Sequence, residues 1–338
     1  MADAFTSVPV KPTLSNYWWA ARNPPADPKT SFAGKTVLIT GANVGLGFEA
    51  AIKFAALGAS NLILGVRSLP KGEQAKAKIE ARTGCSAGVI QLIELDMSRY
   101  QSIEKFFQQV NRRFTVVHAA VLNAGVFQRS YELSTEGWEM SIQVNAISTA
   151  YLGILLLPKL RETGLSTGRA AHLEIVASCA QGDANVKNVR DPSSILQKIN
   201  DPKHFGIGSQ YSISKLLAMW VTTHIAAEVP VEQVIVSACC PSMCKSNLTD
   251  NWGFVLHGID TFSRSILGRT TEEGSRTLVS GTLLGPEGHG GFWTHDRIAK
   301  PAALVVSDEG KKLGTQCWKE ILNLLRRQNP EVDLILKG

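Results

Sequence analysis

The stretch "KTVLITGANVGLGFEAAIKFAALGA", residues 35–59, decides the fold. Its β-branched start is typical of a strand, and its second half is typical of a helix that stops near Gly58. Between them, Gly41, Gly45 and Gly47 would let the backbone pass close to a pyrophosphate at the helix N-terminus, where free N–H groups favour anions. The alternative is that these glycines only allow tight packing of the helix on the strand. The strand–turn–helix context favours a nucleotide-binding turn.

After this unit, apolar strands and helices alternate along the chain. Strands are expected at 61–66, 89–96, 117–123, 171–178 and 233–240, and helices near 69–82, 99–113, 134–162 and from Tyr211 onward. The strands are apolar throughout, which is typical of a parallel sheet covered on both faces. We predict an α/β fold with a doubly wound parallel sheet (a Rossmann fold), as a single domain over residues 35–338 behind an N-terminal extension at 1–34.

The composition excludes several classes of protein. With 44% hydrophobic and 19% charged residues, the 338-residue chain is typical of a folded soluble protein. The net charge of +6 is scattered without a basic run, which argues against nucleic-acid binding. No run of eighteen apolar residues and no secretory pattern is present, so no transmembrane segment is expected. Six cysteines without a CxxC pair indicate reduced thiols in a cytoplasmic protein.

Two further segments have competing interpretations. "YWWAAR" at 17–22 is expected to pack on the main body rather than touch a membrane surface, and "NPPADPK" at 23–29 to be a linker. His289 and His295 lack a carboxylate or cysteine partner at a suitable spacing, so no metal site is expected. Their segment is predicted to form the last strand of the sheet, with both histidines on its solvent side.

A cationic residue stands where an acidic one usually marks NAD binding. That acid follows the second strand and holds the ribose 2′-hydroxyl. From Ala50 to Gly72 the chain has no Asp or Glu, and Arg67 occupies the position. A guanidinium can grip a 2′-phosphate, so we predict NADP(H) as the cofactor. The alternative is that Arg67 is a solvated loop residue.

Tyr211 and Lys215 share one face of an expected helix, because they are four positions apart. Such a pair could transfer protons, or it could simply line a helix, and spacing alone does not decide.

With this fold and "YSISK" at 211–215 together, the chain resembles the short-chain dehydrogenase/reductase family. The resemblance runs from Lys35 to beyond Pro241. The family's markers stand in order, namely "TGANVGLG" at 40–47, "ELDMS" at 94–98, "NAG" at 123–125, "VNAIS" at 144–148, Ser178, "YSISK", and "PSMCKS" at 241–246.

The resemblance implies a catalytic role for four side chains. A free tyrosine has a pKa of about 10, and the adjacent ammonium of Lys215 would lower it so that Tyr211 exchanges a proton with the substrate oxygen. Lys215 would also bind the nicotinamide ribose. Ser178 would hydrogen-bond the carbonyl oxygen, and Asn145 would anchor a water that passes protons to Lys215. The family often has two serines here, and Ala177 replaces the first.

The resemblance also implies a set of cofactor contacts. Asp96 would meet the adenine, unless it only caps a helix, and Asn123 would steady the central strand. Ser242 and Ser246 replace the usual glycine and threonine after Pro241. The residues expected to bind the cofactor are Gly41, Asn43, Gly45, Leu46, Gly47, Arg67, Asp96, Met97, Asn123, Ala124, Gly125, Tyr211, Lys215, Pro241 and Ser246.

Two segments depart from compact members of the family. The insert at 179–210, with a short helix expected around 193–200, resembles the retinol-dehydrogenase-like branch and would border the substrate, unless it is a surface excursion. The segment 247–269 is a candidate lid, because Trp252, Phe254, Leu256 and Phe262 are too apolar for an exposed loop, unless they are core residues. Both favour a bulky, lipophilic substrate.

The expected function is therefore that of an NADPH-dependent carbonyl reductase, or the reverse alcohol dehydrogenase, acting on a bulky lipophilic ketone or aldehyde, with a role in secondary metabolism. Two alternatives stay open: a non-redox isomerase, dehydratase or cyclase, and an NADP(H)-sensing regulatory protein. The oligomeric state stays open: the resemblance implies a homodimer or a tetramer formed through the long helices, unless the insert and the extension block that interface.

Overall fold

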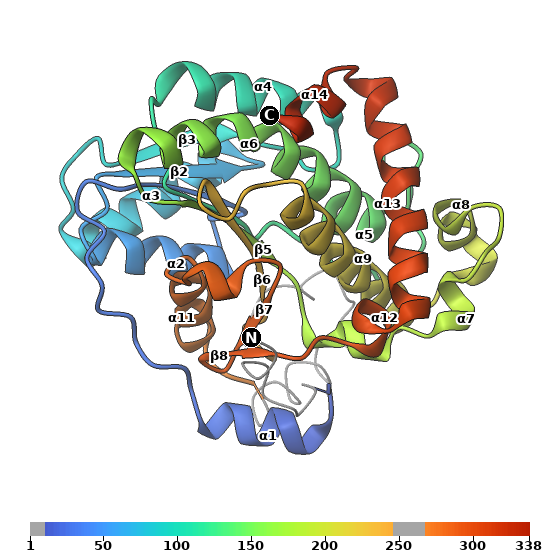
Figure 1. The fold of residues 1–338 in the computed structure, drawn as a ribbon. Helices are drawn as coiled ribbons and strands as arrows, with labels where there is room; N and C mark the ends of the chain where they lie inside the picture. Colours follow the sequence, from blue (N-terminus) through green and yellow to red (C-terminus); the bar gives the residue numbers. More distant parts are fainter. Residues whose placement is uncertain (1–10, 246–267) are drawn as a thin grey trace.

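The computed structural model describes residues 11–245 and 268–338. Its centre is one eight-stranded sheet in the order β3-β2-β1-β4-β5-β6-β7-β8, parallel except for the antiparallel edge strand β8 (Figure 1). The strands are β1 (Thr36–Thr40), β2 (Asn61–Val66), β3 (Ile90–Glu94), β4 (Ala119–Leu122), β5 (Ala171–Val176), β6 (Val234–Cys239), β7 (Phe292–Thr294) and β8 (Arg297–Ala299). The predicted doubly wound α/β fold is confirmed.

Helices cover both faces of the sheet, and each face has its own hydrophobic core (Figure 1). One layer holds α2 (Gly45–Ala56), α3 (Leu69–Thr83) and α11 (Thr271–Gly281). The other holds α4 (Tyr100–Arg113), α6 (Ser148–Thr167), α9 (Ile207–Ala227), α13 (Asp308–Gln328) and α14 (Val332–Lys337). The sheet reverses its order between β1 and β4, and ligands of such sheets bind where the carboxyl ends of the strands diverge.

One helix is long and apolar enough to cross a membrane by length and composition alone. It runs over Met140–Thr167, as α5 (Met140–Ile142), the π-helical turn η1 (Gln143–Ile147) and α6, and 94% of its apolar window is buried inside the protein. It is therefore the core helix of the larger layer.

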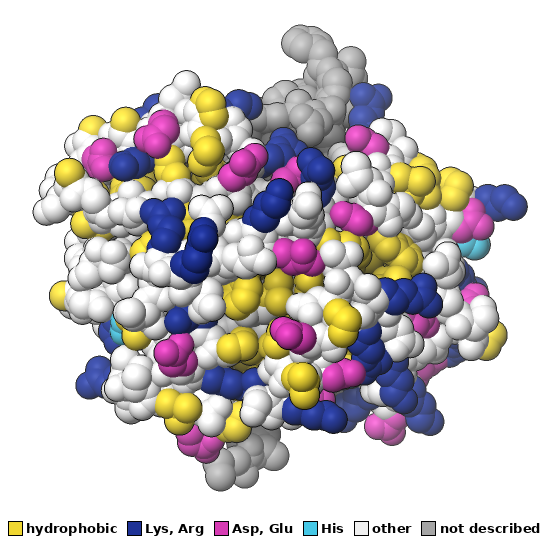
Figure 2. All heavy atoms as spheres, turned by 90° about the horizontal axis from the view of Figure 1, so that it is seen from above, with side chains coloured by type: hydrophobic (Ala, Val, Ile, Leu, Met, Phe, Trp, Pro, Cys, Tyr) yellow, Lys and Arg dark blue, Asp and Glu magenta, His cyan; other side chains and the backbone are white. Residues whose placement is uncertain are grey.

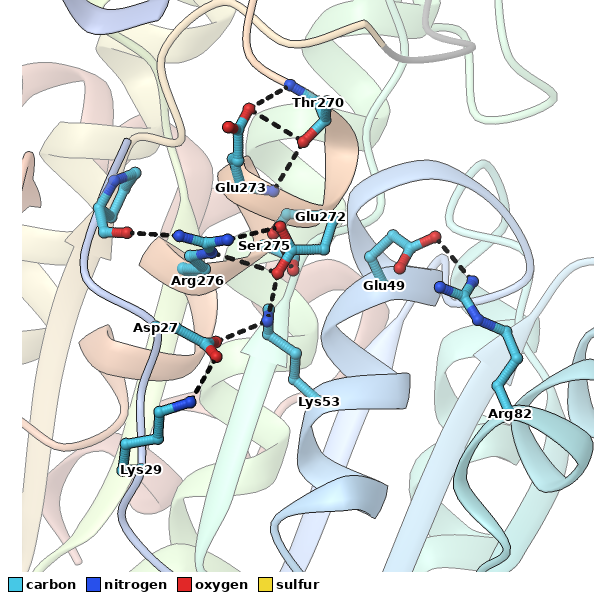
Figure 3. Close-up of polar contacts among 11 residues, drawn as sticks. Asp27, Lys29, Glu49, Lys53, Arg82, Thr270, Glu272, Glu273, Ser275 and Arg276 are labelled. Carbon is cyan, nitrogen blue, oxygen red and sulfur yellow. Dashed lines mark hydrogen bonds and ion pairs between the residues drawn. The ribbon is translucent and has the colours of Figure 1, made fainter. Parts of the chain in front are cut away.

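The N-terminal extension is attached to the main body. Helix α1 (Leu14–Arg22) places Tyr17 and Ala20 against the protein, while Trp18 and Trp19 stay half exposed. The segment expected to be a linker is pinned, because Asp27 binds Lys53 of α2 at 2.7 Å (Figure 3).

The same ion cluster reaches α11. Lys53 also pairs with Glu272 at 2.5 Å, and Glu272 binds Arg276 at 2.8 Å. Arg276 in turn donates to the Pro25 carbonyl at 3.0 Å, which ties the extension to α11 (Figure 3). Two cations at Asp27 lower the pKa of its carboxyl to about 2.

The insert consists of short helical pieces, η2 (Cys179–Asp183), α7 (Val186–Val189), α8 (Ile195–Asn200) and η3 (Pro202–His204). The expected short helix is α8. Its first N–H groups bind the Glu320 carboxylate of α13, with Leu196 N to Oε2 at 2.8 Å, so α7 and α8 pack away from the sheet (Figure 1).

Surface charge is spread rather than gathered. On the face drawn in Figure 2, lysines and arginines are interspersed with aspartates and glutamates around apolar side chains. On this face, the mixture of charges agrees with the scattered basic residues of the sequence.

Candidate active site

The glycine turn lies at the carboxyl end of β1, and each of its glycines has a physical requirement. Gly41 and Gly45 have φ of +67° and +62°, in the left-handed region that favours glycine. A Cβ at Gly47 would lie 2.5 Å from Asn123 Nδ2 and 2.6 Å from the Gly41 carbonyl oxygen. The turn thus packs too closely for side chains and opens α2, whose first N–H groups favour an anion.

Residues after β4 hold this turn in place. Asn123 Nδ2 donates to the carbonyls of Thr40 at 2.9 Å and Gly41 at 3.2 Å. The Ala124 backbone N–H donates to Thr40 Oγ1 at 2.9 Å. The segment 123–125 therefore lies directly against the glycine turn, on the route to the catalytic side chains, because a Cβ at Gly125 would be 3.2 Å from Asn145 Oδ1 and 3.8 Å from Lys215 Nζ.

The remaining expected nucleotide contacts fall in two groups. Arg67 is exposed immediately after β2, beside the turn, since the Gly41 N–H binds the Gly65 carbonyl at 2.8 Å. Asp96 follows β3, where its Oδ1 accepts from Ser98 N at 3.0 Å and from Ser98 Oγ at 2.7 Å. Its carboxylate thus also orders the turn into α4.

The positions of three further residues expected to contact the nucleotide say less about how it would bind. Met97 is 5% exposed and belongs to the hydrophobic core, which leaves only its backbone for a ligand. Asn43 is half buried in the glycine turn. Leu46 is also half buried, and its side chain packs next to Gly274 of α11.

Tyr211 and Lys215 lie on α9 and face the sheet end together. Lys215 Nζ is 5.7 Å from the centroid of the Tyr211 ring and donates to the Val176 carbonyl at 2.7 Å. Burial lowers the pKa of Lys215 from 10.5 to about 8. Tyr211 is half buried, and its ring stacks on Phe127 with the centroids 4.4 Å apart. The ammonium is thus fixed behind a phenol that stays reachable.

Asn145 lies in the π-helical turn η1, an irregularity that is frequent at functional sites. Its Oδ1 accepts from Val126 N at 2.8 Å, and its Nδ2 donates to Val126 O at 2.8 Å and to Ser214 Oγ at 3.0 Å. These bonds link the core helix, the segment after β4, and α9. The side chain is therefore held rigidly beside Lys215.

Ser178 ends β5 and begins the insert. It is half buried, and its Oγ accepts from Ala180 N at 3.1 Å as the cap of η2. The Lys215 ammonium binds the carbonyl of Val176, two residues earlier on the same strand. The structure therefore brings Ser178, Lys215, Asn145 and Tyr211 to one end of the sheet.

The loop after β6 is only partly described. Ser242 has φ of +67°, in the left-handed region that favours glycine, so the serine is strained there. Ser246 and the candidate lid up to residue 267 lie outside the described residues. Lys245 N binds the Arg269 carbonyl at 2.8 Å, which joins the two ends of this segment.

Arg269 is a buried residue near the site that the sequence does not reveal. It is 1% exposed, and its guanidinium donates to Ala20 O and Asn23 O, both at 2.7 Å, and to Pro241 O at 3.4 Å. The first two carbonyls lie at the C-terminal end of α1, where the helix dipole favours a cation. Arg269 thereby joins α1 to the loop after β6.

The prediction for the two histidines is wrong in its details. The last strand is β8, and both rings are half buried and hydrogen-bonded instead of facing solvent. His289 Nε2 is 2.8 Å from Ala226 O, and His295 Nδ1 is 2.8 Å from Arg269 Nη2. Burial, with the nearby Arg269, lowers the pKa of His295 to about 4, so it accepts this bond as a neutral ring. Within residues 11–245 and 268–338, no cluster of three or more metal-binding side chains is found.

Comparison with known proteins identifies the family. Residues 35–180 match the family model described as short chain dehydrogenase. The chain is 59% identical over 336 residues to the short-chain dehydrogenase/reductase ffsI of Aspergillus flavipes, with 99% of each chain covered. It is 55% identical over 338 residues to the short-chain dehydrogenase/reductase phmF of Phaeosphaeria nodorum, with 100% of each covered. The chain belongs to the short-chain dehydrogenase/reductase family.

A solved structure supports the fold. A short-chain dehydrogenase from Sphingobium yanoikuyae in complex with NADPH superposes with a TM-score of 0.54 at 19% identity, covering 73% of this chain and 84% of that one. As a family member, this short-chain dehydrogenase/reductase is an oxidoreductase that uses NAD(H) or NADP(H) with a small-molecule substrate. The glycine turn, whose space a Cβ at Gly47 would fill, fits such a dinucleotide.

Proposed function

We propose that the protein is an NADPH-dependent carbonyl reductase, or the reverse alcohol dehydrogenase, acting on a bulky lipophilic ketone or aldehyde. The observation that carries the proposal is the buried Lys215 ammonium held beside the reachable Tyr211 ring, at the same sheet end as Ser178 and the glycine turn. A cytoplasmic location and a role in secondary metabolism are part of the proposal.

The chain's own residues would handle the proton and hold the substrate oxygen. When bound, the nicotinamide would supply the hydride. Ser178 would donate a hydrogen bond to the substrate oxygen, and Tyr211 would give that oxygen its proton. The Lys215 charge would favour the phenolate that remains, because an opposite charge close by lowers the pKa of a phenol. Asn145 would fix the segment 123–126 against both.

Arg67 supports NADP(H) over NAD(H) in this proposal. The residue is an exposed cation next to the glycine turn, and no acidic residue stands between Ala50 and Gly72. Arg67→Ser should weaken NADPH binding about tenfold or more, since a charge-assisted hydrogen bond contributes roughly 1.5–3 kcal/mol. NADH binding should be nearly unchanged.

The control for this substitution is Lys71→Ser, which removes an exposed cation four positions further on. Cofactor fluorescence titrations give both dissociation constants for each variant. Equal weakening of NADPH and NADH by Arg67→Ser would show that Arg67 does not read the 2′-phosphate. Equal effects of both substitutions would assign the change to overall charge.

The reaction itself is tested with NADPH that carries deuterium at the transferable pro-S position. The purified protein is incubated with this cofactor and a panel of lipophilic ketones, and mass spectrometry follows the products. An alcohol that has gained one deuterium supports the proposal, and the Tyr211→Phe variant should not form it. A product changed in structure without deuterium would contradict net reduction and favour an isomerase, dehydratase or cyclase.

A further inference from the structure

Two thiols lie next to each other behind Ser178. Cys179 follows β5 and Cys240 follows β6, and the strands are paired up to Val176 and Cys239. The Cys240 sulfur lies against the backbone of Cys179 itself, so the two cysteines are direct neighbours. The Cys240 sulfur also accepts backbone N–H groups from Cys179 at 3.1 Å and from Ser242 at 3.3 Å. This cluster resembles a site for a thiolate, because two backbone N–H groups donate to one sulfur.

The other cysteines do not share this arrangement. Cys239 belongs to the core on the other face of the sheet, where burial and the nearby Glu174 raise the pKa of its thiol. The Cys244 thiol donates to the Pro241 carbonyl at 3.4 Å. Cys317 is fully buried in α13.

The two thiols differ in acidity. Hydrogen bonds from Cys179 and from the backbone lower the pKa of Cys240, whereas the Cys240 sulfur and burial raise the pKa of Cys179. Cys240 is therefore the better nucleophile, and Cys179 retains its proton until Cys240 has reacted.

We propose that Cys179 and Cys240 are a redox site that forms a reversible disulfide with a peroxide as the oxidant. The Cys240 thiol first releases its proton, and the thiolate attacks one oxygen of hydrogen peroxide. The O–O bond breaks, a sulfenic acid forms, and the hydroxide that leaves takes up the released proton to give one water. Cys179 then attacks the sulfenic sulfur, the S–S bond forms, and a second water leaves with the Cys179 proton. Two thiols are oxidised and one peroxide is reduced to two waters.

The disulfide would affect the active site because it would move Ser178. A disulfide places the sulfurs about 2 Å apart, closer than two unbonded thiols can lie, so Cys179 must move toward β6. Ser178 precedes Cys179 directly and caps the same 3-10 turn, so it moves with it. This consequence for catalysis rests on the proposed reductase function, whereas the disulfide itself does not.

Tyr17 of the N-terminal helix covers the pair. Its hydroxyl contacts the Cys179 sulfur at 3.5 Å, and the two cysteines are 3% and 1% exposed. Peroxide therefore reaches Cys240 when α1 moves aside. We expect Tyr17→Ala to speed disulfide formation, because it removes the aromatic cover while it leaves both thiols in place.

The experiment treats the full chain with graded hydrogen peroxide, blocks remaining thiols with N-ethylmaleimide, and identifies cross-linked peptides by mass spectrometry without reduction. The expected product joins the peptide of Cys179 to that of Cys240, with the mass of two hydrogens lost. It should form in the Cys239→Ser and Cys317→Ser controls, and should be absent from Cys179→Ser and Cys240→Ser. Absence of the 179–240 link while the partly exposed Cys85 is oxidised would overturn the proposal.

A second readout follows activity with the substrate that the deuterium assay identifies. The cross-linked enzyme should lose about a hundredfold in rate, because displacing a hydrogen-bond donor to the reacting oxygen costs this much. Dithiothreitol should restore it, and oxidised Cys317→Ser should behave like the native chain. A link that forms without loss of activity would overturn its effect on Ser178. Failure of the reductase assay would leave the cross-link result standing, so the two proposals fail separately.

Discussion

The nucleotide half and the substrate half of this protein are built in different ways. At the nucleotide half, the contacting residues follow two neighbouring strands and bond to each other at the carboxyl ends of these strands. They are the glycine turn after β1, and Asn123 and Ala124 after β4. At the substrate half, Tyr17 meets Cys179 across 162 positions, and Arg269 meets Ala20 across 249. The contacts of the first half span 83 and 84 positions but join two directly paired strands, β1 and β4. The contacts of the second half span 162 and 249 positions and join elements outside the sheet pairing.

The comparison teaches which perturbations should separate cofactor binding from chemistry. Changes in the glycine turn should affect binding of the dinucleotide first. Changes at α9 and behind Ser178 should affect the rate while the dinucleotide still binds.

The largest effect is expected from Tyr211→Phe. It removes the proton donor but keeps the ring that stacks on Phe127 at 4.4 Å. The rate should fall by about a thousandfold, with NADPH binding unchanged, as measured by steady-state kinetics and fluorescence titration. Tyr131→Phe is the control, because that hydroxyl binds Asn200 O at 2.7 Å, away from Tyr211. A comparable loss in both variants would remove Tyr211 from the chemistry.

The next effect is expected from Gly47→Ala in the nucleotide half. The new methyl group would lie 2.5 Å from Asn123 Nδ2, so the turn must shift, at about 1–3 kcal/mol of stability. Both NADPH affinity and the free energy of unfolding should drop. Gly208→Ala is the control, since no heavy atom lies within 4 Å of a Cβ there. Unchanged NADPH binding in Gly47→Ala would contradict the assignment of the turn.

A pH titration should separate activity from stability. The pKa of Lys215 is about 8 in the folded protein, below its ordinary value of 10.5. Above about pH 8 the ammonium is lost, so Tyr211 gives up its proton less readily and kcat/KM should fall. Between these two values the unfolded chain binds more protons, so this group makes stability rise with pH. An alkaline loss that follows unfolding would contradict the role of Lys215.

The smallest expected effect is a gain in stability. Ser242 has φ of +67°, where glycine carries no penalty, so Ser242→Gly should stabilise the protein by about 1 kcal/mol. Denaturant unfolding measures it, with Ser86→Gly as the control, because that exposed loop serine does not have a positive φ. A loss of stability in both variants would show that the strain at Ser242 is offset by its contacts.

The fold could be predicted because short-range patterns carry it, whereas Tyr211, Lys215, Asn145 and Ser178 are singled out by the resemblance to the family. Apolar runs predict buried strands, and a strand, a glycine turn and a helix predict the first unit. The partners of the histidines could not be predicted, since Arg269 and Ala226 reach them only through tertiary packing. Arg269 itself looks like an ordinary surface cation in the sequence, and its acceptors are backbone carbonyls that no residue pattern marks.

The hydrogen bonds that hold helix α1 on the protein also have a consequence for the order in which the chain folds during synthesis. Ala20 and Asn23 are synthesised long before Arg269, whose guanidinium binds their carbonyls. In the same way, the Ala26 N–H binds the carboxylate of Asp296, which follows it by 270 positions. Chains fold from the N-terminal side while they are synthesised, and contacts between residues that lie far apart in the sequence form late. Helix α1 is therefore among the first segments to leave the ribosome and among the last to dock. A nascent chain becomes a closed enzyme only when nearly all of its sequence has emerged.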